Sequence, residues 1–220
     1  MDDAATIGDH YRRSRERLTA LLAETDPAGW DQPVAACPGW SVHDVLAHLV
    51  GTVEDAMAGR LTGPPTPAHT AAQVAERRDM APAVLLAAWS SAAPGFEELV
   101  TGLGVWPAAI DAVSHEHDVR QALDRPGARD DPSVAHLARL LVAGIDAPAA
   151  VTVDFGTDAA TGGDPDAEPI TLTADAFEVL RLRLGRRTPA QVAALDWSRD
   201  PAPVLDHLFI FGPAERDLVE

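Results

Sequence analysis

Residues 111–120 read Asp-Ala-Val-Ser-His-Glu-His-Asp-Val-Arg and gather two histidines, three carboxylates and an arginine. At about 100° per residue, a helix places Asp111, His115 and Asp118 in one narrow sector. That sector borders an apolar one, which consists of Ala108, Ala112, Val119 and Leu123. A carboxylate and an imidazole one turn apart, beside a buried face, are suited to bind the same divalent cation. Two ligands do not complete a site, so another segment must supply a third.

The other polar residues of this helix have a different orientation. His117 falls on the opposite side, where we expect a packed or capped histidine, or a ligand if the helix is rotated. Glu116 falls between the two faces, and we expect it to be exposed. A solvated, charged face without a metal is the alternative interpretation of the whole stretch, because charged side chains on helices usually face water.

The composition is that of a globular chain with a large acidic excess. Its 220 residues are 46% hydrophobic and carry a formal net charge of −17. Such a chain repels nucleic-acid phosphates and anionic membranes, so we expect neither as a partner. Cys37 is the single cysteine, which excludes an intramolecular disulfide and favours the reducing cytoplasm. We expect no signal peptide, because the N-terminal residues lack an apolar segment, and no run of about 18 apolar residues predicts a membrane span.

Apolar residues at helical spacing predict four long helices in the first part of the chain, over 4–24, 41–57, 81–100 and 107–123. Helices of about five turns joined by short to medium loops suggest a four-helix bundle. Ser41 is a good N-cap for the second helix, with Asp44 at position N3. His48 lies at the edge of that helix's apolar stripe, from where its imidazole can reach the bundle interior. A half-buried histidine bonded to a nearby carbonyl is the alternative reading.

The composition changes after a fifth helix, which we expect over 132–145. Two segments rich in β-branched residues predict strands, over 149–155 and 169–173, with a Gly/Asp-rich loop between them. Three further helices are expected, over 174–184, 188–195 and 201–208. The sequence therefore predicts an α+β fold, with a helical bundle over 1–145 and a small α+β domain over 146–220. We expect the cleft between them to hold the functional site.

Three motifs carry a resemblance to a known family. Residues 37–49, CPGWSVHDVLAHL, include His48; Asp111-x3-His115-x2-Asp118 follows on the later helix; Leu-Gly-Arg-Arg occupies 184–187. Together they resemble the mycothiol-dependent maleylpyruvate isomerase family, whose bundle belongs to the wider DinB-like fold. The resemblance extends over nearly the whole chain. It implies one divalent metal, usually zinc, bound by His48, Asp111 and His115.

One position departs from the family pattern, in which the first ligand of the later helix is usually Glu and not Asp111. Aspartate is one methylene shorter, and metal–oxygen distances near ~2.1 Å leave little slack. Either the helices lie closer together, or a water bridges, or the site is weakened or lost, with Glu116 and His117 as fallback ligands. Asp118 is read as the group that fixes the tautomer of a ligating imidazole, or alternatively as a surface carboxylate paired with an arginine.

The chemistry implied by the resemblance is thiol activation. A thiol with a pKa of ~8.5 is mostly protonated at neutral pH, and coordination to a divalent cation delivers the thiolate. With mycothiol as the thiol cosubstrate, the thiolate adds to an activated alkene in a cis–trans isomerisation, or attacks another small electrophile in an S-transfer. Cys37 is read as a packing residue and not as the nucleophile.

The anion-binding candidates follow the C-terminal motif. Arg186 is our candidate catalytic and cofactor-binding residue for an anionic group on the substrate or thiol, because a guanidinium matches a carboxylate bidentately. Arg187 is the second cofactor-binding candidate, and Arg181 and Arg183 are weaker ones. A charge that offsets the helix dipole is an equal alternative for Arg186. Asp118 is the other candidate catalytic residue.

Two other functions stay open at this point. A non-catalytic relative would bind a small ligand or partner and retain only a degenerate metal site, which the aspartate at position 111 favours. A metal-dependent hydrolase would use bound water and need no thiol. The sequence also leaves open whether the protein is a monomer or a homodimer.

Overall fold

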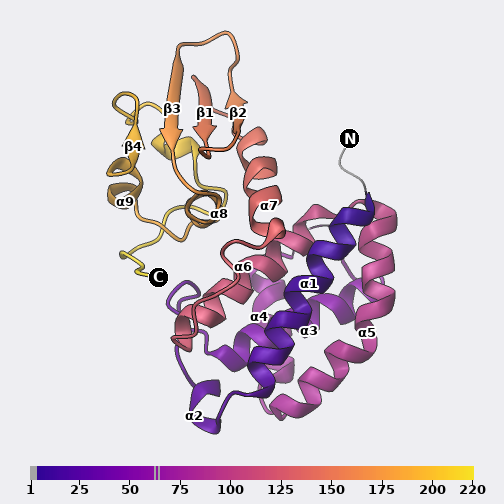
Figure 1. Ribbon diagram of the computed structural model, residues 1–220. Helices are drawn as coiled ribbons and strands as arrows, with labels where there is room; N and C mark the ends of the chain where they lie inside the picture. The colour runs from indigo at the N-terminus through magenta and orange to yellow at the C-terminus, as the bar shows by residue number, and fades with distance from the viewer. Residues whose placement is uncertain (1–3, 62, 64) are drawn as a thin grey trace. The chain divides into compact units, whose positions relative to one another are not determined.

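The computed structural model describes residues 4–61, 63 and 65–220, which divide into two compact units (Figure 1). Unit 1 is Met1–Pro126 and is helical; unit 2 is Gly127–Glu220 and combines helices with a four-stranded mixed sheet. The predicted α+β class, with a helical N-terminal region and a C-terminal sheet, is therefore confirmed. No helix in the described ranges is both long and apolar enough to cross a membrane.

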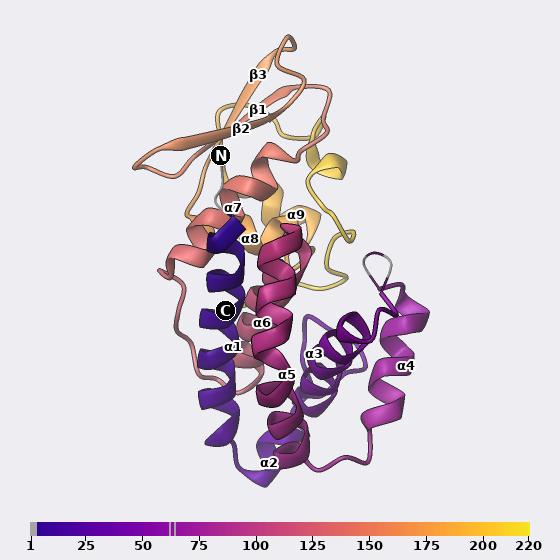
Figure 2. The same cartoon turned by 90° about the vertical axis from the view of Figure 1, so that its right-hand side faces the viewer.

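Four long helices form the body of unit 1: α1 (Ala4–Ala23), α3 (Val42–Met57), α5 (Pro82–Leu103) and α6 (Trp106–Ala122). α1 packs against α5 and α6, and α3 packs against the same two helices, so that the four close into a ring. This is the bundle that the apolar spacing predicted. A short helix, α2 (Pro27–Trp30), precedes α3, and α4 (Pro67–Arg77) packs along α3 (Figure 2).

Local signals set where the two site-bearing helices begin. The Ser41 hydroxyl accepts a hydrogen bond from the Asp44 amide, and the Asp44 carboxylate accepts one from the Ser41 amide at 2.9 Å, which forms a capping box at the start of α3. Gly104 has φ of 65°, a left-handed conformation that glycine adopts without strain, and it ends α5. The chain reverses there, and α6 begins at Trp106.

The sheet of unit 2 has the strand order β2-β1-β3-β4. β1 pairs in parallel with β3 and antiparallel with β2, while β4 pairs antiparallel with β3. The strand bounds are β1 Ala150–Asp154, β2 Ala159–Gly163, β3 Pro169–Thr173 and β4 Asp196–Trp197. β2 lies inside the segment expected to be a loop. Its sequence, Ala-Ala-Thr-Gly-Gly, has no apolar alternation, and it becomes a strand through its hairpin pairing with β1.

The remaining elements of unit 2 are α7 (Pro132–Ala143), α8 (Ala176–Arg183), α9 (Pro189–Ala193) and a 3-10 turn at Leu205–His207. The helix expected over 201–208 is thus reduced to one turn, and Pro201 and Pro203, which cannot donate backbone hydrogen bonds, precede that turn. α7 packs against α8 and β2. It therefore belongs to unit 2, and the compact units divide after Pro126 and not at the boundary of 145 read from the sequence.

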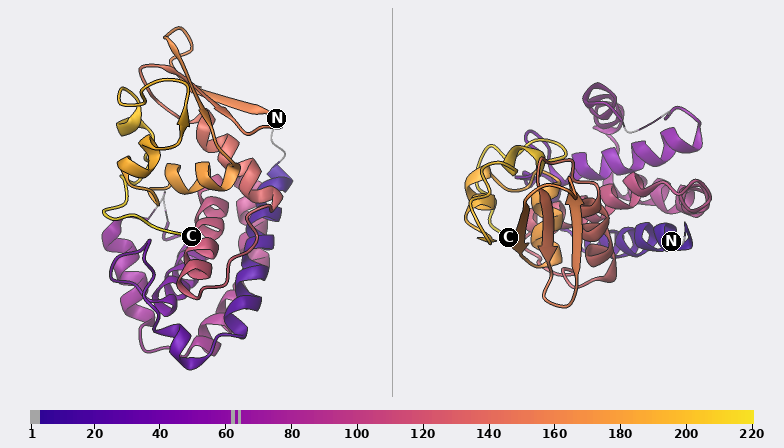
Figure 3. Two further views of the ribbon diagram at one scale, coloured as in Figure 1. Left: turned by 60° about the vertical axis from the view of Figure 1, so that its left-hand side comes forward. Right: turned by 90° about the horizontal axis from the view of Figure 1, so that it is seen from above.

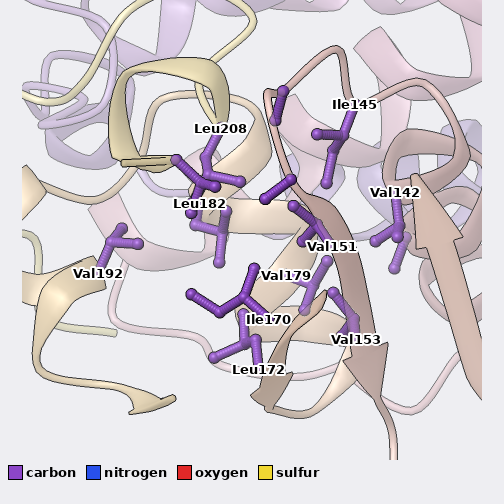
Figure 4. Close-up of a cluster of buried hydrophobic side chains, with 14 residues drawn as sticks. Val142, Ile145, Val151, Val153, Ile170, Leu172, Val179, Leu182, Val192 and Leu208 are labelled. Carbon is purple, nitrogen blue, oxygen red and sulfur yellow. The ribbon is translucent and has the colours of Figure 1, made fainter. Parts of the chain in front are cut away.

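The core of unit 2 explains why α7 belongs there. α7 and α8 lie next to the sheet (Figure 3). The inward residues of β1 and β3 meet Ala138 and Val142 of α7 and Val179 and Leu182 of α8 in one apolar cluster (Figure 4). Ala138 and Val142 are fully buried in this cluster. The hydrophobic face of α7 is therefore covered by the sheet and α8, which the helical periodicity alone did not reveal.

Candidate metal centre

Three side chains from two helices of unit 1 converge. His48 comes from α3, and Asp111 and His115 lie one turn apart on α6. His48 Nε2 is 3.4 Å from Asp111 Oδ2, and His115 Nε2 is 3.4 Å from Asp111 Oδ1. One ligand atom from each residue lies within 4.8 Å of the other two. The fold thus brings together the three residues that the sequence motifs nominated as metal ligands.

The separations fit a divalent cation. Two ligand atoms at about 2.0–2.1 Å from a tetrahedral zinc ion are about 3.3 Å apart, which matches both nitrogen–oxygen distances in the cluster. Two imidazoles and a carboxylate also leave a fourth position for an exogenous ligand. The Asp111 side chain is 33% exposed while both histidines are buried, so the cluster opens on the aspartate side. The two 3.4 Å distances show that Asp111, although shorter than the glutamate of the family pattern, reaches both imidazoles.

Each imidazole is held from behind through its other nitrogen. His48 Nδ1 lies 3.0 Å from Gln73 Oε1, and His115 Nδ1 lies 3.0 Å from Asp118 Oδ2. Asp118 is fully buried, so its alternative reading as a surface carboxylate is wrong. Because both Nδ1 atoms are engaged, both Nε2 atoms face Asp111, which is the arrangement that orients histidines in metal sites.

The connector before α3 contributes two more side chains. Its backbone turns back on itself, with Val34 and Trp40 joined by a hydrogen bond of 2.9 Å. This places the Trp40 ring 5.3 Å from the His48 ring and 6.3 Å from the His115 ring, measured between centroids. Cys37 Sγ lies 3.7 Å from Asp118 Oδ2, to which it donates, and 3.8 Å from His115 Nδ1. Cys37, His115 and Asp118 form a second convergent group.

The cluster is electrostatically prepared for positive charge. Burial raises the pKa of Asp111, but the charges and hydrogen bonds of His48 and His115 outweigh it and hold that pKa well below its ordinary value. Burial lowers the pKa of His115, but Cys37, Asp111 and Asp118 together raise it well above the usual value. Protons and a metal cation therefore compete for the same imidazole nitrogens, and acid opposes metal binding.

Comparison with known proteins bears on the bundle first. Residues 11–110 match the family model described as "Mycothiol maleylpyruvate isomerase N-terminal domain". The chain is thus similar to this family over its helical N-terminal segment. The matched residues include His48 and end one position before Asp111. The two α6 residues of the cluster are therefore placed by the geometry and not by the family match.

Solved structures resemble the chain over most of its length. The crystal structure of the mycothiol-dependent maleylpyruvate isomerase aligns with a TM-score of 0.55 at 13% sequence identity, covering 90% of this chain and 93% of that one. A histidine-to-alanine mutant of the mycothiol-dependent maleylpyruvate isomerase aligns over the same shares, with a TM-score of 0.54 and 13% identity. At this identity the likeness establishes the fold. No curated protein sequence matches the chain.

Neither fallback ligand belongs to the candidate metal centre. Glu116 is fully buried, contrary to the exposed position expected from the helical wheel. Its carboxylate accepts hydrogen bonds from Arg17 at 2.7 and 2.8 Å, from Ser14 at 2.9 Å and from Arg120 at 3.0 Å. His117 is also buried, and among the described residues neither it nor Glu116 is part of a convergent ligand group.

The arginine candidates lie in unit 2 and differ in how far their side chains are engaged by hydrogen bonds and ion pairs. Arg187 is buried and pairs with Glu178 at 2.7 Å and Glu220 at 3.0 Å, so its charge is compensated inside the unit. Arg181 is fully buried and also pairs with Glu220. Arg183 is buried and donates to backbone carbonyls of unit 2, and this burial lowers its pKa to about 10.

Arg186 is the partly exposed member of this group, and its Nη1 donates to the Leu184 carbonyl at 2.6 Å. It lies in the other compact unit from the metal cluster, so its functional role stays a prediction.

Gln73 is the site residue that sequence reasoning missed. It is 1% exposed and reaches His48 from α4. A signal was present, because Gln73, Val74 and Arg77 occur at the spacing of one helical face. A polar side chain beside a buried valine on that face requires a partner. Periodicity could not say that the partner is a histidine of α3.

A substitution at Glu116 separates structural from metal-binding carboxylates. We expect Glu116→Gln to lower the free energy of unfolding by about 2–3 kcal/mol, because the carboxylate no longer compensates Arg17 and Arg120 in a buried site. Urea denaturation measures this change, and Glu98→Gln, at an exposed position, is the control. Metal content should be unchanged in the folded variant; a loss of bound metal without a loss of stability would assign Glu116 to the centre instead.

Proposed function

We propose that the protein is a metal-dependent enzyme that uses mycothiol as its thiol cosubstrate against a small electrophile, in an S-transfer or a cis–trans isomerisation. The observation that carries the proposal is the convergence of two imidazole nitrogens on the Asp111 carboxylate, at distances that fit a zinc ion. The family match of residues 11–110, and the likeness to a mycothiol-dependent maleylpyruvate isomerase, support mycothiol as the thiol.

The residues of the centre have different proposed roles. His48 Nε2, His115 Nε2 and the Asp111 carboxylate would hold the cation. Asp118 holds the proton of His115 on Nδ1, and the Trp40 ring covers the two imidazoles on one side. A divalent cation bound here supplies the Lewis acidity that favours the thiolate form of a thiol at neutral pH.

The electron flow distinguishes the two reactions. In isomerisation, the sulfur lone pair forms a C–S bond at an activated alkene, the π electrons move to the conjugated carbonyl, and the carbon–carbon bond rotates. Reversal of the same steps releases the thiolate unchanged. In S-transfer, the C–S bond persists, and a leaving group or an opened ring carries away the electron pair. Neither reaction requires Cys37 as a nucleophile, because mycothiol supplies the thiolate.

Arg186 is proposed to bind an anionic group of the thiol or of the electrophile. It is less enclosed than its neighbour Arg187, whose guanidinium is already held between two glutamates. A guanidinium of this kind fixes a carboxylate in two parallel hydrogen bonds and so selects orientation as well as charge.

Metal content tests the centre directly. We expect protein purified without chelator to contain about one zinc per chain, the stoichiometry of a site with three protein ligands and an open position. His48→Ala should lose it because one of the ligands is removed. Elemental analysis of both proteins makes the measurement, with His207→Ala in unit 2 as the matched control. Wild-type protein free of metal would favour the non-catalytic alternative.

Thiol dependence tests the reaction class. We expect thiol consumption, or isomerisation of an activated alkene, to require mycothiol and to be abolished in His115→Ala, because that variant cannot hold the cation. A panel of epoxides, alkyl halides and conjugated alkenes, followed with and without mycothiol, makes the measurement. Turnover that needs no thiol would identify a hydrolase, and turnover that survives in His115→Ala would contradict the assigned ligand.

The Arg186 assignment predicts a change in KM and not in kcat. We expect Arg186→Ala to raise the KM for the anionic substrate about 10–100-fold, the usual value of a charged hydrogen-bond pair. Steady-state kinetics with each substrate varied in turn gives the answer. Arg199→Ala, an arginine of unit 2 paired with Glu168, is the control. Unchanged KM values for both substrates would remove Arg186 from the site.

A further inference from the structure

A buried amide connects one candidate metal ligand to a buried carboxylate. Gln73, on α4, lies between His48 and Asp55, both on α3. Its Oε1 is 3.0 Å from His48 Nδ1, and its Nε2 donates to Asp55 Oδ2 at 2.7 Å. All three residues are at most 5% exposed. In such a place, each polar atom must be satisfied by its neighbours and not by water.

The carboxylate decides which way the amide points. Burial raises the pKa of Asp55, but hydrogen bonds from Gln73, His69 and Arg60 outweigh it and lower that pKa to about 2. An ionised carboxylate only accepts hydrogen bonds, so it must face the amide NH2 group. The amide oxygen is then directed to His48. Thr52, whose hydroxyl lies 3.4 Å from the same Oε1 atom, is placed to donate to it.

The amide in turn decides the protonation of the histidine. An amide oxygen cannot donate a hydrogen bond, so His48 Nδ1 must carry a proton to complete the contact. The other ring nitrogen, Nε2, then faces the Asp111 carboxylate at 3.4 Å. A cation bound between the two groups would take the Nε2 lone pair and a carboxylate oxygen as ligands.

We propose that Gln73 and Asp55 are positioning residues of the metal centre: Asp55 orients the Gln73 amide, and the amide keeps the His48 proton on Nδ1 and leaves Nε2 for the cation. This inference rests on the proposed metal function, which it deepens. Because an amide does not titrate, the hydrogen bonds from His48 through Gln73 to Asp55 hold a proton in place and do not relay one. His115 differs, because its Nδ1 faces the Asp118 carboxylate.

The approach of α4 to α3 supports this role independently. Gly51 lies on α3 between His48 and Asp55, and a Cβ atom there would stand 2.8 Å from Gln73 Cβ and 3.0 Å from Arg77 Nη1. The glycine therefore lets α4 lie close enough for Gln73 to reach the imidazole. Arg77 fastens the contact, since it donates to Glu54 of α3 at 3.2 Å.

The test uses the full chain and three variants, with zinc as the metal probe. Gln73→Met keeps a long unbranched side chain but removes both hydrogen bonds. Asp55→Asn keeps the shape but can turn its own NH2 group toward Gln73, which would rotate the amide and reverse the His48 tautomer. Gly51→Ala pushes α4 away from α3. Gln32→Met, at an exposed glutamine of the same unit, is the control.

Two readouts are measured on each protein: the zinc dissociation constant, and the tautomer of neutral His48 in chelator-treated protein by nitrogen-15 NMR. We expect the wild type and Gln32→Met to carry the His48 proton on Nδ1. The three variants should bind zinc about 10–100-fold more weakly, the usual effect of removing such a partner. Asp55→Asn should also shift the proton to Nε2, which loss of packing alone would not do.

The outcomes separate this inference from the proposed function. A wild-type proton on Nε2, or unchanged zinc affinity in folded Gln73→Met and Asp55→Asn, overturns the positioning role and leaves the metal centre intact. If no protein binds zinc but the tautomer responds as expected, the proposed metal function is contradicted, and only the orientation of His48 by Gln73 and Asp55 is supported. If Gln73→Met does not fold, Asp55→Asn decides, because it is isosteric.

Discussion

The bundle is organised by the need to compensate a polar helix that is buried on nearly every side. α6 carries His115, Glu116, His117 and Asp118 in succession, and all four are buried. Each unpaired charge in such a place would cost several kcal/mol, so the surrounding helices must supply partners. α1 supplies Ser14 and Arg17 to Glu116, and α3 brings its histidine to the side of Asp111. The buried polar residues of α6 thus explain why α1 and α3 carry polar side chains on the faces that meet it.

Two kinds of support stand behind the two imidazoles. His115 has a carboxylate behind it, which increases the electron donation of its ring, whereas His48 has a neutral amide. Together with Asp111, which both Nε2 atoms face, the two imidazoles are surrounded by two carboxylates, those of Asp111 and Asp118, and by the amide of Gln73. Two negative charges can be balanced by one divalent cation or by two protonated imidazoles, so protons and a metal would compete for this cluster. Asp111 is its partly exposed member, on the side where a further ligand could enter.

Unit 2 uses its arginines mainly for its own stability. Arg181 and Arg187 share Glu220, and Arg187 also pairs with Glu178, so two buried guanidinium groups are neutralised by two acids. Arg183 is buried against carbonyl oxygens. The four arginines between 181 and 187 therefore have different surroundings, and Arg186 is the one that is partly exposed.

The sequence determined the α+β class and the four long helices, because helical periodicity is a local property of the chain. One-turn spacing placed Asp111 and His115 on the same face of a helix, and the resemblance of the motifs to a known family nominated these two residues and His48 as ligands. The sequence did not determine that β2 is a strand, that α7 belongs with the sheet, or that Glu116 is buried. These depend on which surfaces meet, and so do the contacts of Gln73, which lies on a helix remote in sequence from α6. Spacing assigns residues to a face of a helix, but only tertiary packing decides what covers that face and which buried polar atoms must pair.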